Sequence, residues 1–347
     1  APKRIPAQGR DDKGQENEGK PYASRAPPRI RGSPNITLRQ APLGGALSRA
    51  NKTQRIIYLA FAARAPISSL NRKDPAMANI NLASETAADQ CVWSLMKQEA
   101  AAYAVKETAL SSFLHATILD QTSLDGAMVN HLSEKLATAD FSALKLRQVL
   151  SEAISTDSTL IDFAAKDLLA VKERDPACHS YLQCFLYFKG YMAIQTHRFA
   201  HALYISGRDL LAFHLQNRCS ELFSVDINPA AVIGHGIMLD HATGFVMGET
   251  ARIGNDCSVL QGVTLGGTGK SDEDRHPKVG DRVLVGANAS ILGNIRIGHG
   301  AKIAAGSVVL KPVEDNCTVA GVPAKPVGGP CCGNPAQTMD QTLGEEK

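Results

Sequence analysis

Residues 279–309 read VGDRVLVGANASILGNIRIGHGAKIAAGSVV, and an apolar residue returns at every sixth position of this stretch. A period of six fits neither the repeat of an α-helix nor the alternation of a half-buried strand. It is typical of hexapeptide turns, in which three faces close a triangular coil of about 18 residues. One apolar residue per face points inward, and a small neighbour lets the chain turn the corner. The inward positions are Val279, Val285, Ile291, Ile297, Ile303 and Val309.

The same period extends back to residue 227 with two interruptions. It slips by two residues between Phe245 and Met247. A gap of 14 residues then separates Leu265 from Val279, and its segment GGTGKSDEDRHPK has no inward apolar residue, so we expect a loop outside the coil. Over residues 226–325 we therefore predict a left-handed parallel β-helix. The upstream inward positions are Ile227, Ile233, Leu239, Phe245, Met247, Ile253, Val259 and Leu265.

Residues 81–225 have a different composition, with one proline and three glycines. Apolar side chains recur at three- and four-residue spacing, as along Leu160, Ala164 and Leu168, which predicts amphipathic helices. We expect an all-helical domain here, so the predicted fold class is α+β, with the helical domain preceding the β-helix. Similar helical patterns run through 87–105, 107–119, 144–154, 181–195 and 197–218.

Residues 1–80 hold nine of the 17 prolines, and no acidic residue occurs from Gly19 to Lys73. An arginine-rich, serine-containing, acid-poor segment is typical of an organelle transit peptide, and a disordered tail is the alternative. We therefore expect a plastid (chloroplast) or mitochondrial location, or a cytoplasmic one if translation starts at Met77. The last segment, residues 326–347, is predicted to be a flexible tail.

The overall composition excludes several classes of protein. The 37 basic and 34 acidic residues are mixed along the chain, which argues against a nucleic-acid binder. The apolar run IIYLAFAA at residues 56–63 is too short to span a bilayer, so no membrane insertion is expected. Eight cysteines form no CxxC, which favours reduced thiols; the pair Cys331–Cys332 lies in the tail.

The segment LDHATG at residues 239–244 places Asp240 and His241 directly after an inward leucine. Histidine titrates near neutral pH and can accept a proton from a hydroxyl nucleophile. Asp226 lies 15 residues before His241, a little under one coil, so we expect it near the same edge of the prism. There its carboxylate would orient the imidazole; the alternative is that Asp226 caps the join between the domains.

Five segments of the chain resemble the serine O-acetyltransferase family, its plant members in particular. The resemblance covers about residues 87–340 and implies acetyl transfer from the co-substrate acetyl-CoA to the hydroxyl of L-serine. The products would be O-acetylserine and CoA, in the activating step before cysteine synthesis. The segments are DINPAAVIGHGIMLDHATGFVMGET (226–250), LQGVTLGGTGK (260–270), DRHPKVG (274–280), ILGNIRIG (291–298) and AGVPAKPVG (320–328).

The resemblance implies roles for matching residues, with His241 as general base and Asp226 as its orienting partner. The substrate ammonium would meet Asp175, Asp240 and, more weakly, Glu249. The substrate carboxylate would meet Arg275, with His276 also in contact with serine. Asp175 precedes a proline, so the sequence alone favours a helix N-cap there.

Acetyl-CoA needs a slot without bulky side chains, and the family's groove runs along small residues of the coils. Backbone N–H groups around residues 266–269 would stabilise the tetrahedral oxyanion. The residues that match the family's CoA groove are Gly267, Thr268, Ala287 and Ala305, with Lys302 near the phosphates.

The family also implies partners. Its coils associate as homotrimers with active sites between neighbouring prisms, and helical domains join two trimers. L-Cysteine commonly inhibits by competing at the serine site. Plant members dock on O-acetylserine sulfhydrylase through an acidic-aromatic tail that closes on isoleucine. Here NPAQTMDQT (334–342) resembles the approach to that tail, but the sequence closes on LGEEK, so we expect either that the tail is missing from this sequence or that docking is weakened.

Rival hypotheses remain open at this point. A hexapeptide acetyltransferase for a sugar or xenobiotic would share the histidine base. A hexapeptide carbonic anhydrase would hold zinc through His235, His241 and His276, and an inactive scaffold would only regulate the sulfhydrylase. The helical segment HRFAH (197–201) spaces two histidines as in zinc proteases but has arginine where those need glutamate, so no metal is expected.

Overall fold

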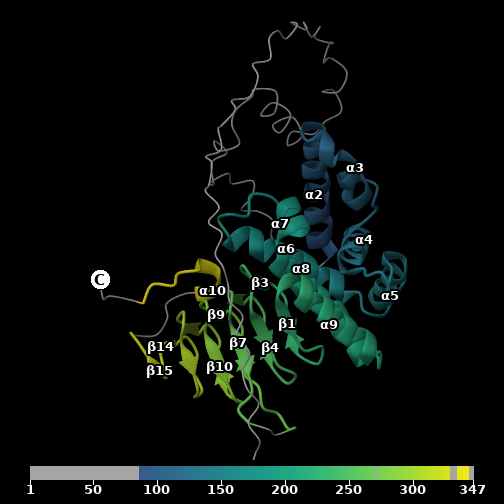
Figure 1. Cartoon of the computed structure of the whole chain (residues 1–347). Coiled ribbons are helices and arrows are strands. Elements are labelled where there is room, and N and C mark those ends of the chain that lie inside the picture. Colours follow the sequence, from purple (N-terminus) through teal and green to yellow (C-terminus); the bar gives the residue numbers. More distant parts are fainter. Residues whose placement is uncertain (1–85, 270–271, 329–333, 344–347) are drawn as a thin grey trace, which may run out of the picture. The chain divides into compact units, whose positions relative to one another are not determined.

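The computed structural model describes residues 86–269, 272–328 and 334–343 (Figure 1). The predicted leader over residues 1–80, including Met77, lies outside the described residues, and so does the Cys331–Cys332 pair. Within the described ranges, no helix has the length and apolar character needed to cross a membrane. The six cysteines of these ranges are all free thiols.

The first half of the described chain is helical, as the spacing of apolar residues predicts. Ser180 caps one helix by accepting a hydrogen bond from the Gln183 N–H at 3.0 Å. The helices are α2 (Thr86–Lys106), η2 (Thr108–Leu110), α3 (Ser111–Leu114), the π-helical η3 (His115–Leu119), α4 (Leu124–Leu136), α5 (Ala143–Thr156), α6 (Thr159–Arg174), α7 (Tyr181–Tyr187), α8 (Lys189–Ile205) and α9 (Asp209–Phe223).

The predicted helices over 181–195 and 197–218 have the wrong bounds. Phe188 is extended (φ −79°, ψ 105°), so the chain turns between α7 and α8. Gly207 adopts φ 78° and ends α8 in a Schellman motif, because the N–H of Arg208 bonds to the carbonyl of Leu203 at 2.9 Å. Three helices therefore replace the two predicted ones, and α8 begins at Lys189.

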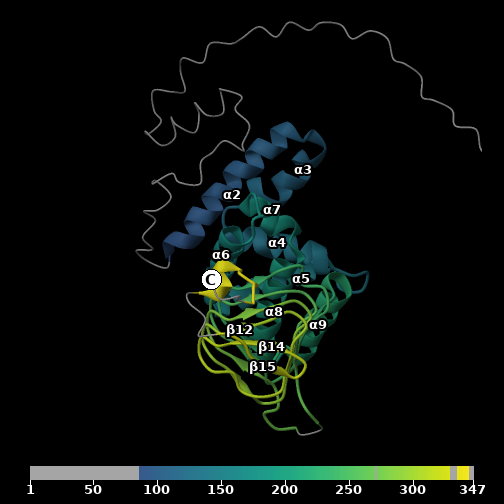
Figure 2. The same cartoon turned by 90° about the vertical axis from the view of Figure 1, so that its left-hand side faces the viewer.

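The second half is a parallel β-helix of very short strands, which confirms the predicted fold class. Sheet A orders its strands β1-β4-β7-β10-β13, sheet B orders them β2-β5-β8-β11, and sheet C runs β3-β6-β9-β12-β14 with β15 antiparallel at its end. Figure 2 views the coils from the end that carries β14 and β15. Within each coil the chain passes from sheet A to B to C, so the prism has A–B, B–C and C–A edges.

The strand bounds follow the hexapeptide pattern closely. They are β1 (Val225–Ile227), β2 (Val232–Ile233), β3 (Met238–Leu239), β4 (Phe245–Met247), β5 (Arg252–Ile253), β6 (Ser258–Val259), β7 (Thr264–Gly266), β8 (Lys278–Val279), β9 (Leu284–Val285), β10 (Ser290–Leu292), β11 (Arg296–Ile297), β12 (Lys302–Ile303), β13 (Val308–Val309), β14 (Thr318–Gly321) and β15 (Ala324–Pro326).

The inward residues form three columns, one per sheet, because the register pairs equivalent positions of successive coils. Every inward position predicted from the period of six is buried. On sheet C, for example, Leu239 pairs with Val259 and Val259 with Val285. Continuous apolar columns of this kind bury each coil against its neighbours.

The slip of two residues in the period is an enlarged corner. Eight residue steps lead from Leu239 to Met247, whereas six lead from Val259 to Leu265, although Met247 and Leu265 are register partners. The first coil therefore carries two additional residues at its C–A edge. We call residues 240–245 the His241 corner.

Helices α6 and α8 are joined to the first coil by a buried ionic cluster around Asp167. Its carboxylate accepts hydrogen bonds from Arg198 Nη2 at 2.7 Å, Gln195 Nε2 at 2.9 Å and the Ile237 N–H at 2.8 Å. Arg198 also donates to the carbonyl of Gly234 at 2.7 Å. This cluster gives Arg198 a structural role, and Figure 1 shows the helices gathered at the end of the β-helix that carries β1 and β3.

A short C-terminal segment returns to the β-helix. It contains α10 (Pro335–Thr338), in which the carbonyl of Ala336 accepts a hydrogen bond from Ser258 Oγ at 2.7 Å. Gln337 Nε2 donates to Glu173 Oε1 of α6, also at 2.7 Å. Residues 334–343 are thereby attached to both domains.

A buried histidine of α4 makes stability pH-dependent. His131 stacks on Phe185 with 5.4 Å between ring centroids, and burial, with a smaller contribution from Lys135, lowers the pKa of His131 from 6.5 to about 4. As the pH falls below 6.5 the unfolded chain takes up a proton that the folded chain does not, so the free energy of unfolding decreases until about pH 4. We expect His131→Leu to flatten the decrease of Tm over this window, measured by circular dichroism. An unchanged pH dependence would contradict this.

Candidate active site

The His241 corner has a strained backbone that presents the imidazole to solvent. His241 and Ala242 have φ of 54° and 59°, and the N–H groups of Ala242 and Thr243 bond to the carbonyls of Asp240 and His241 at 2.5 and 2.7 Å. These are two consecutive γ-turns with positive φ, a conformation that costs about 1–3 kcal/mol per non-glycine residue. The His241 side chain is 74% exposed.

One carboxylate lies beside His241, and a second lies close enough to affect the first. Asp240 Oδ2 is 3.8 Å from His241 Nε2. Burial raises the pKa of Asp240, His241 opposes this shift, and the nearby charge of Asp175 adds to it. Asp175, at the end of α6, is thus close enough for its like charge to raise the pKa of Asp240.

The expected N-cap role of Asp175 is wrong. Asp175 is the C-cap residue of α6, and its Oδ1 accepts a hydrogen bond from the Ala177 N–H at 2.7 Å. The proline that follows it begins no helix, since α7 starts only at Tyr181 after its own cap. The aspartate instead stabilises the turn that leads from α6 toward α7.

Asp226 lies on β1, whose register partner at this position is Val246 of β4. One carboxylate oxygen accepts a hydrogen bond from Gln216 Nε2 of α9 at 2.7 Å. In the described part of the chain no hydrogen bond joins Asp226 to His241. Gln216 was not predicted as a site residue, because nothing in the sequence around it resembles a motif.

The A–B edge carries the second group of candidate residues. Arg275 Nη2 pairs with Glu249 Oε2 at 2.7 Å. Thr250 Oγ1 accepts hydrogen bonds from the backbone N–H groups of Arg275 at 3.1 Å and His276 at 3.2 Å. Thr250, which follows Glu249 in the motif but was not predicted, therefore attaches the protruding loop to the coil.

His276 is held as a neutral imidazole. It is 7% exposed, and the Thr250 N–H donates to its Nδ1 at 3.2 Å, so the ring proton resides on Nε2. Burial, reinforced by Arg275 and Lys278, lowers the pKa of His276. The ring packs against Gly248, where a Cβ would overlap it.

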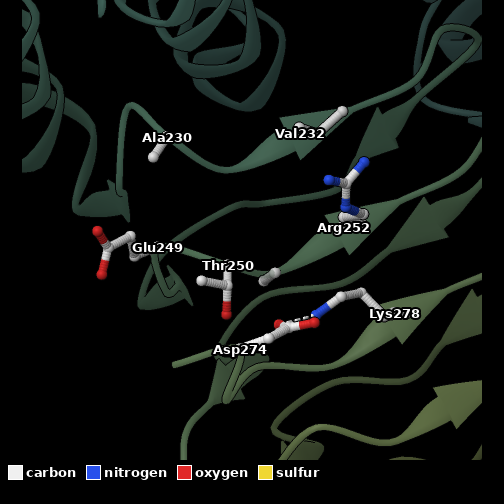
Figure 3. A pocket seen from close by; sticks show the side chains of 8 residues that line it. Ala230, Val232, Glu249, Thr250, Arg252, Asp274 and Lys278 are labelled. Atoms are coloured by element: carbon white, nitrogen blue, oxygen red, sulfur yellow. Dashed lines mark hydrogen bonds and ion pairs between the residues drawn. The ribbon is translucent and has the colours of Figure 1, made fainter. Parts of the chain in front are cut away.

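A pocket of about 270 Å³ opens next to this edge (Figure 3). Lys278 Nζ and Asp274 Oδ1 form an ion pair at 2.5 Å on one side of it. Glu249 and Thr250 contribute to its wall, whereas His241 and Arg275 do not. The pocket is lined by Ala230, Val232, Glu249, Thr250, Ala251, Arg252, Asp274 and Lys278.

The residues predicted to bind CoA fall into three places. Ala287 and Ala305 are stacked on the C–A edge, where the Gly306 N–H bonds to the carbonyl of Ala287 at 2.8 Å. Gly267 and Thr268 follow β7 at the A–B edge. Lys302 lies on sheet C, where its ammonium donates to the carbonyls of Asp340 at 3.2 Å and Thr342 at 2.8 Å.

One chain therefore holds the candidate residues in two groups, which we call half-sites, on opposite sides of sheet A. His241 and Asp240 lie at the C–A edge, with Asp175 of the turn after α6 close enough to affect Asp240, and Glu249, Arg275 and His276 lie at the A–B edge. Strand β4, three residues long, connects the two edges. At about 3.3 Å per residue this strand alone spans roughly 10 Å.

The histidines considered for zinc occupy separate positions. His235, His241 and His276 lie at the B–C, C–A and A–B edges, respectively. His201 Nδ1 contacts the carbonyl oxygen of Pro229 at 2.7 Å, and His197 is buried. Across the described ranges no three His, Cys, Asp or Glu side chains gather in a way that could hold a metal ion.

Comparisons with known proteins agree with the order of the two domains. Residues 92–196 match the family "Serine acetyltransferase, N-terminal", and residues 276–311 match "Bacterial transferase hexapeptide (six repeats)". The serine acetyltransferase of Escherichia coli K12 is 52% identical over 252 residues, which is 73% of this chain and 92% of that protein. The mitochondrial serine acetyltransferase 3 of Arabidopsis thaliana is 51% identical over 256 residues, 72% of this chain and 66% of that protein.

Solved structures are similar as well. A serine acetyltransferase in complex with cysteine has a TM-score of 0.72 at 50% identity, covering 73% of this chain and 99% of that one. The Neisseria gonorrhoeae enzyme in complex with serine has a TM-score of 0.67 at 54% identity, with 68% and 97% covered. A complex with CoA has a TM-score of 0.66 at 51% identity, with 69% and 100% covered. The chain therefore belongs to the serine acetyltransferase family of acyltransferases.

Proposed function

We propose that this chain transfers the acetyl group of acetyl-CoA to the hydroxyl of L-serine, giving O-acetylserine and CoA. The observation that carries the proposal is the His241 corner, where two additional residues expose an imidazole beside the carboxylate of Asp240. The relatives named above act as serine acetyltransferases, and two of the similar structures hold serine and CoA. Serine-dependent release of CoA from acetyl-CoA tests the proposal, and no release with serine would reject it.

In the proposed mechanism His241 is the general base. Its Nε2 accepts the proton of the serine hydroxyl while the hydroxyl oxygen attacks the thioester carbonyl carbon. The tetrahedral intermediate collapses with cleavage of the carbon–sulfur bond, and the departing thiolate takes the proton from the imidazolium. Asp226 orients the other ring nitrogen through its second carboxylate oxygen, since Gln216 occupies the first.

The charges of free serine find complementary groups in the two half-sites. Asp175 and Asp240 would bind the ammonium, which favours their joint ionisation, with Glu249 as a weaker third carboxylate. Arg275 would bind the carboxylate in a bidentate manner after leaving Glu249. The neutral His276 would donate its Nε2 proton to the same substrate. L-Cysteine differs from L-serine only in sulfur for oxygen, so we expect it to compete for these groups.

The half-sites form a complete site when the C–A edge of one subunit meets the A–B edge of the next in a homotrimer, and helical domains then join two trimers. Sheet A supports this arrangement because it separates the two edges within each chain, and Val246 on its outer face is 38% exposed and could meet a neighbour. The CoA groove would run along the same junction, between Ala287 and Ala305 of one subunit and Gly267 and Thr268 of the next.

Mixed oligomers test this sharing. We expect His241→Ala and Arg275→Ala each to be nearly inactive alone. Co-expressed and purified through two different tags, they would recover about one quarter of wild-type activity, because an interface between randomly mixed subunits has about one chance in four of joining an intact His241 edge to an intact Arg275 edge. Arg275→Ala mixed with His276→Ala serves as the control and should recover nothing, since both changes lie on one edge. No recovery in the first mixture would place the whole site in one chain.

We further propose that residues 1–80 direct the chain to an organelle. The support is the acid-poor, arginine-rich composition, together with the mitochondrial location in the name of the Arabidopsis relative. Import of a fusion of residues 1–80 to a fluorescent protein into isolated plastids or mitochondria would identify the organelle.

A further inference from the structure

The His241 corner cannot keep its conformation by local preference. Equivalent corners of later coils have a single residue with positive φ, namely Gly262, Asn288 or Gly306. The His241 corner has two consecutive non-glycine residues in that region, His241 and Ala242. Such a backbone persists only where the surrounding structure determines it. The first turn of α8 lies against this corner.

Helix α8 begins directly on this corner because Phe188 interrupts the helical path. Gly190 lies so close to the corner that a Cβ would overlap the carbonyl oxygen of Leu239 and lie 3.3 Å from the Cβ of Ala242. Glycine stabilises a helix less than alanine does, by about 1 kcal/mol. The close approach to the corner gives a reason for glycine at this position.

A side chain from the preceding position adds a second contact. Lys189 Nζ donates a hydrogen bond to Thr243 Oγ1, and Thr243 Oγ1 in turn donates to the carbonyl of His241 at 3.4 Å. Lys189 is thus connected to the backbone carbonyl of His241 through the hydroxyl of Thr243. Both contacts come from the helical domain, whereas the imidazole belongs to the β-helix.

We propose that Lys189 and Gly190 are positioning residues that hold His241 in its reactive orientation. Gly190 allows α8 to pack directly against Leu239 and Ala242 of the turn. Lys189 stabilises the turn at Thr243 through a hydrogen bond. This inference rests on the proposed role of His241 as general base. Neither residue touches serine or CoA in this proposal, so their effect is on kcat and not on the binding of acetyl-CoA.

The first test is Gly190→Ala in the full-length protein. Its methyl group displaces either α8 or the corner, so we expect kcat to fall at least about 10-fold, while the KM for acetyl-CoA stays within about twofold, as for a misplaced catalytic group. Gly126→Ala in α4 is the matched control. Its new Cβ would lie 3.2 Å from the flexible end of Gln121, so its kcat should equal that of the wild type.

The second test addresses the hydrogen bond. Lys189→Met should lower kcat, and Lys189→Arg should restore most of it because a donor is retained. Thr243→Val keeps the shape of threonine and removes the acceptor. In a double-mutant cycle, Lys189→Met should cost little further activity once Thr243 is valine. Additive losses, or an arginine variant as impaired as the methionine variant, would overturn the positioning role of Lys189.

The outcomes separate this inference from the proposed function. If the wild type releases no CoA with serine, the proposed function itself fails. If the wild type is active, His241→Ala is inactive and Gly190→Ala retains full kcat, only the role of Gly190 fails. If Gly190→Ala does not fold, the Lys189 and Thr243 series decides. A rise in the KM for acetyl-CoA equal to the loss in kcat would indicate general packing.

Discussion

His241→Ala is expected to lower kcat for serine-dependent CoA release by roughly 10²–10⁴-fold, the range that removal of a general base produces. The KM for acetyl-CoA should change little, because the groove residues Ala287 and Ala305 lie on later coils of the same edge. The variant should fold normally, since the side chain is 74% exposed and its removal leaves no cavity in the core. Initial rates with saturating serine and acetyl-CoA measure the effect.

A second variant separates the imidazole from the backbone that carries it. Asparagine tolerates the left-handed region better than most residues, so His241→Asn preserves the φ of 54° without supplying a base. We expect it to be as inactive as the alanine variant. Asp226→Asn should lose less activity, because the base itself remains. If His241→Asn kept more than about a tenth of wild-type kcat, proton transfer by His241 would be excluded as the main contribution.

Asp167→Ala is expected to lower the free energy of unfolding by about 3–5 kcal/mol, the cost of leaving one member of a buried ion pair without its partner. Asp167 and Arg198 are almost fully buried, their 2.7 Å contact joins α6 to α8, and each also bonds to the backbone of the first coil. The variant also leaves the Ile237 N–H and the Gln195 amide without their acceptor. Denaturant unfolding followed by circular dichroism gives the change.

An exposed ion pair provides the matched control. Glu152 and Arg208 form a 2.9 Å contact on the surface, so Glu152→Ala should cost less than about 1 kcal/mol. Asp167→Asn should fall between the two, because its amide oxygen can still accept the Ile237 N–H while the charge is lost. Equal stabilities of Asp167→Ala and Glu152→Ala would show that the buried cluster contributes nothing beyond a surface pair.

Much of the β-helix could be predicted because its pattern is local and repeated. Each inward residue has the same neighbours one coil above and below, so the period of six predicts the columns without knowledge of the rest of the molecule. The helical domain was predicted as a class but not in detail. The helical periodicity of apolar residues continues across Phe188 and Gly207. The extended backbone at Phe188 nevertheless ends α7, and the Schellman motif at Gly207 ends α8.

The candidate site was predicted less completely, for a different reason. His241, Asp240 and Arg275 stand in motifs that the family resemblance supplies. Gln216 and Thr250 were missed, since each acts through hydrogen bonds to residues that are distant in sequence or in another element. The family resemblance predicts Asp175 as a substrate ligand. The sequence around it predicts a helix N-cap, whereas the structure ends α6 at Arg174 and makes Asp175 the C-cap.

By itself the sequence determined the order of the two domains, the inward columns and the residues able to do acid–base chemistry, because these depend on periodicity and residue type. Only the tertiary structure decided that the two-residue slip forms a strained corner, that α8 begins on it, and that His241 and Arg275 occupy different edges of one prism. The physical reason is that a corner or a helix break redirects the chain in space, and contacts between distant segments then determine which side chains meet.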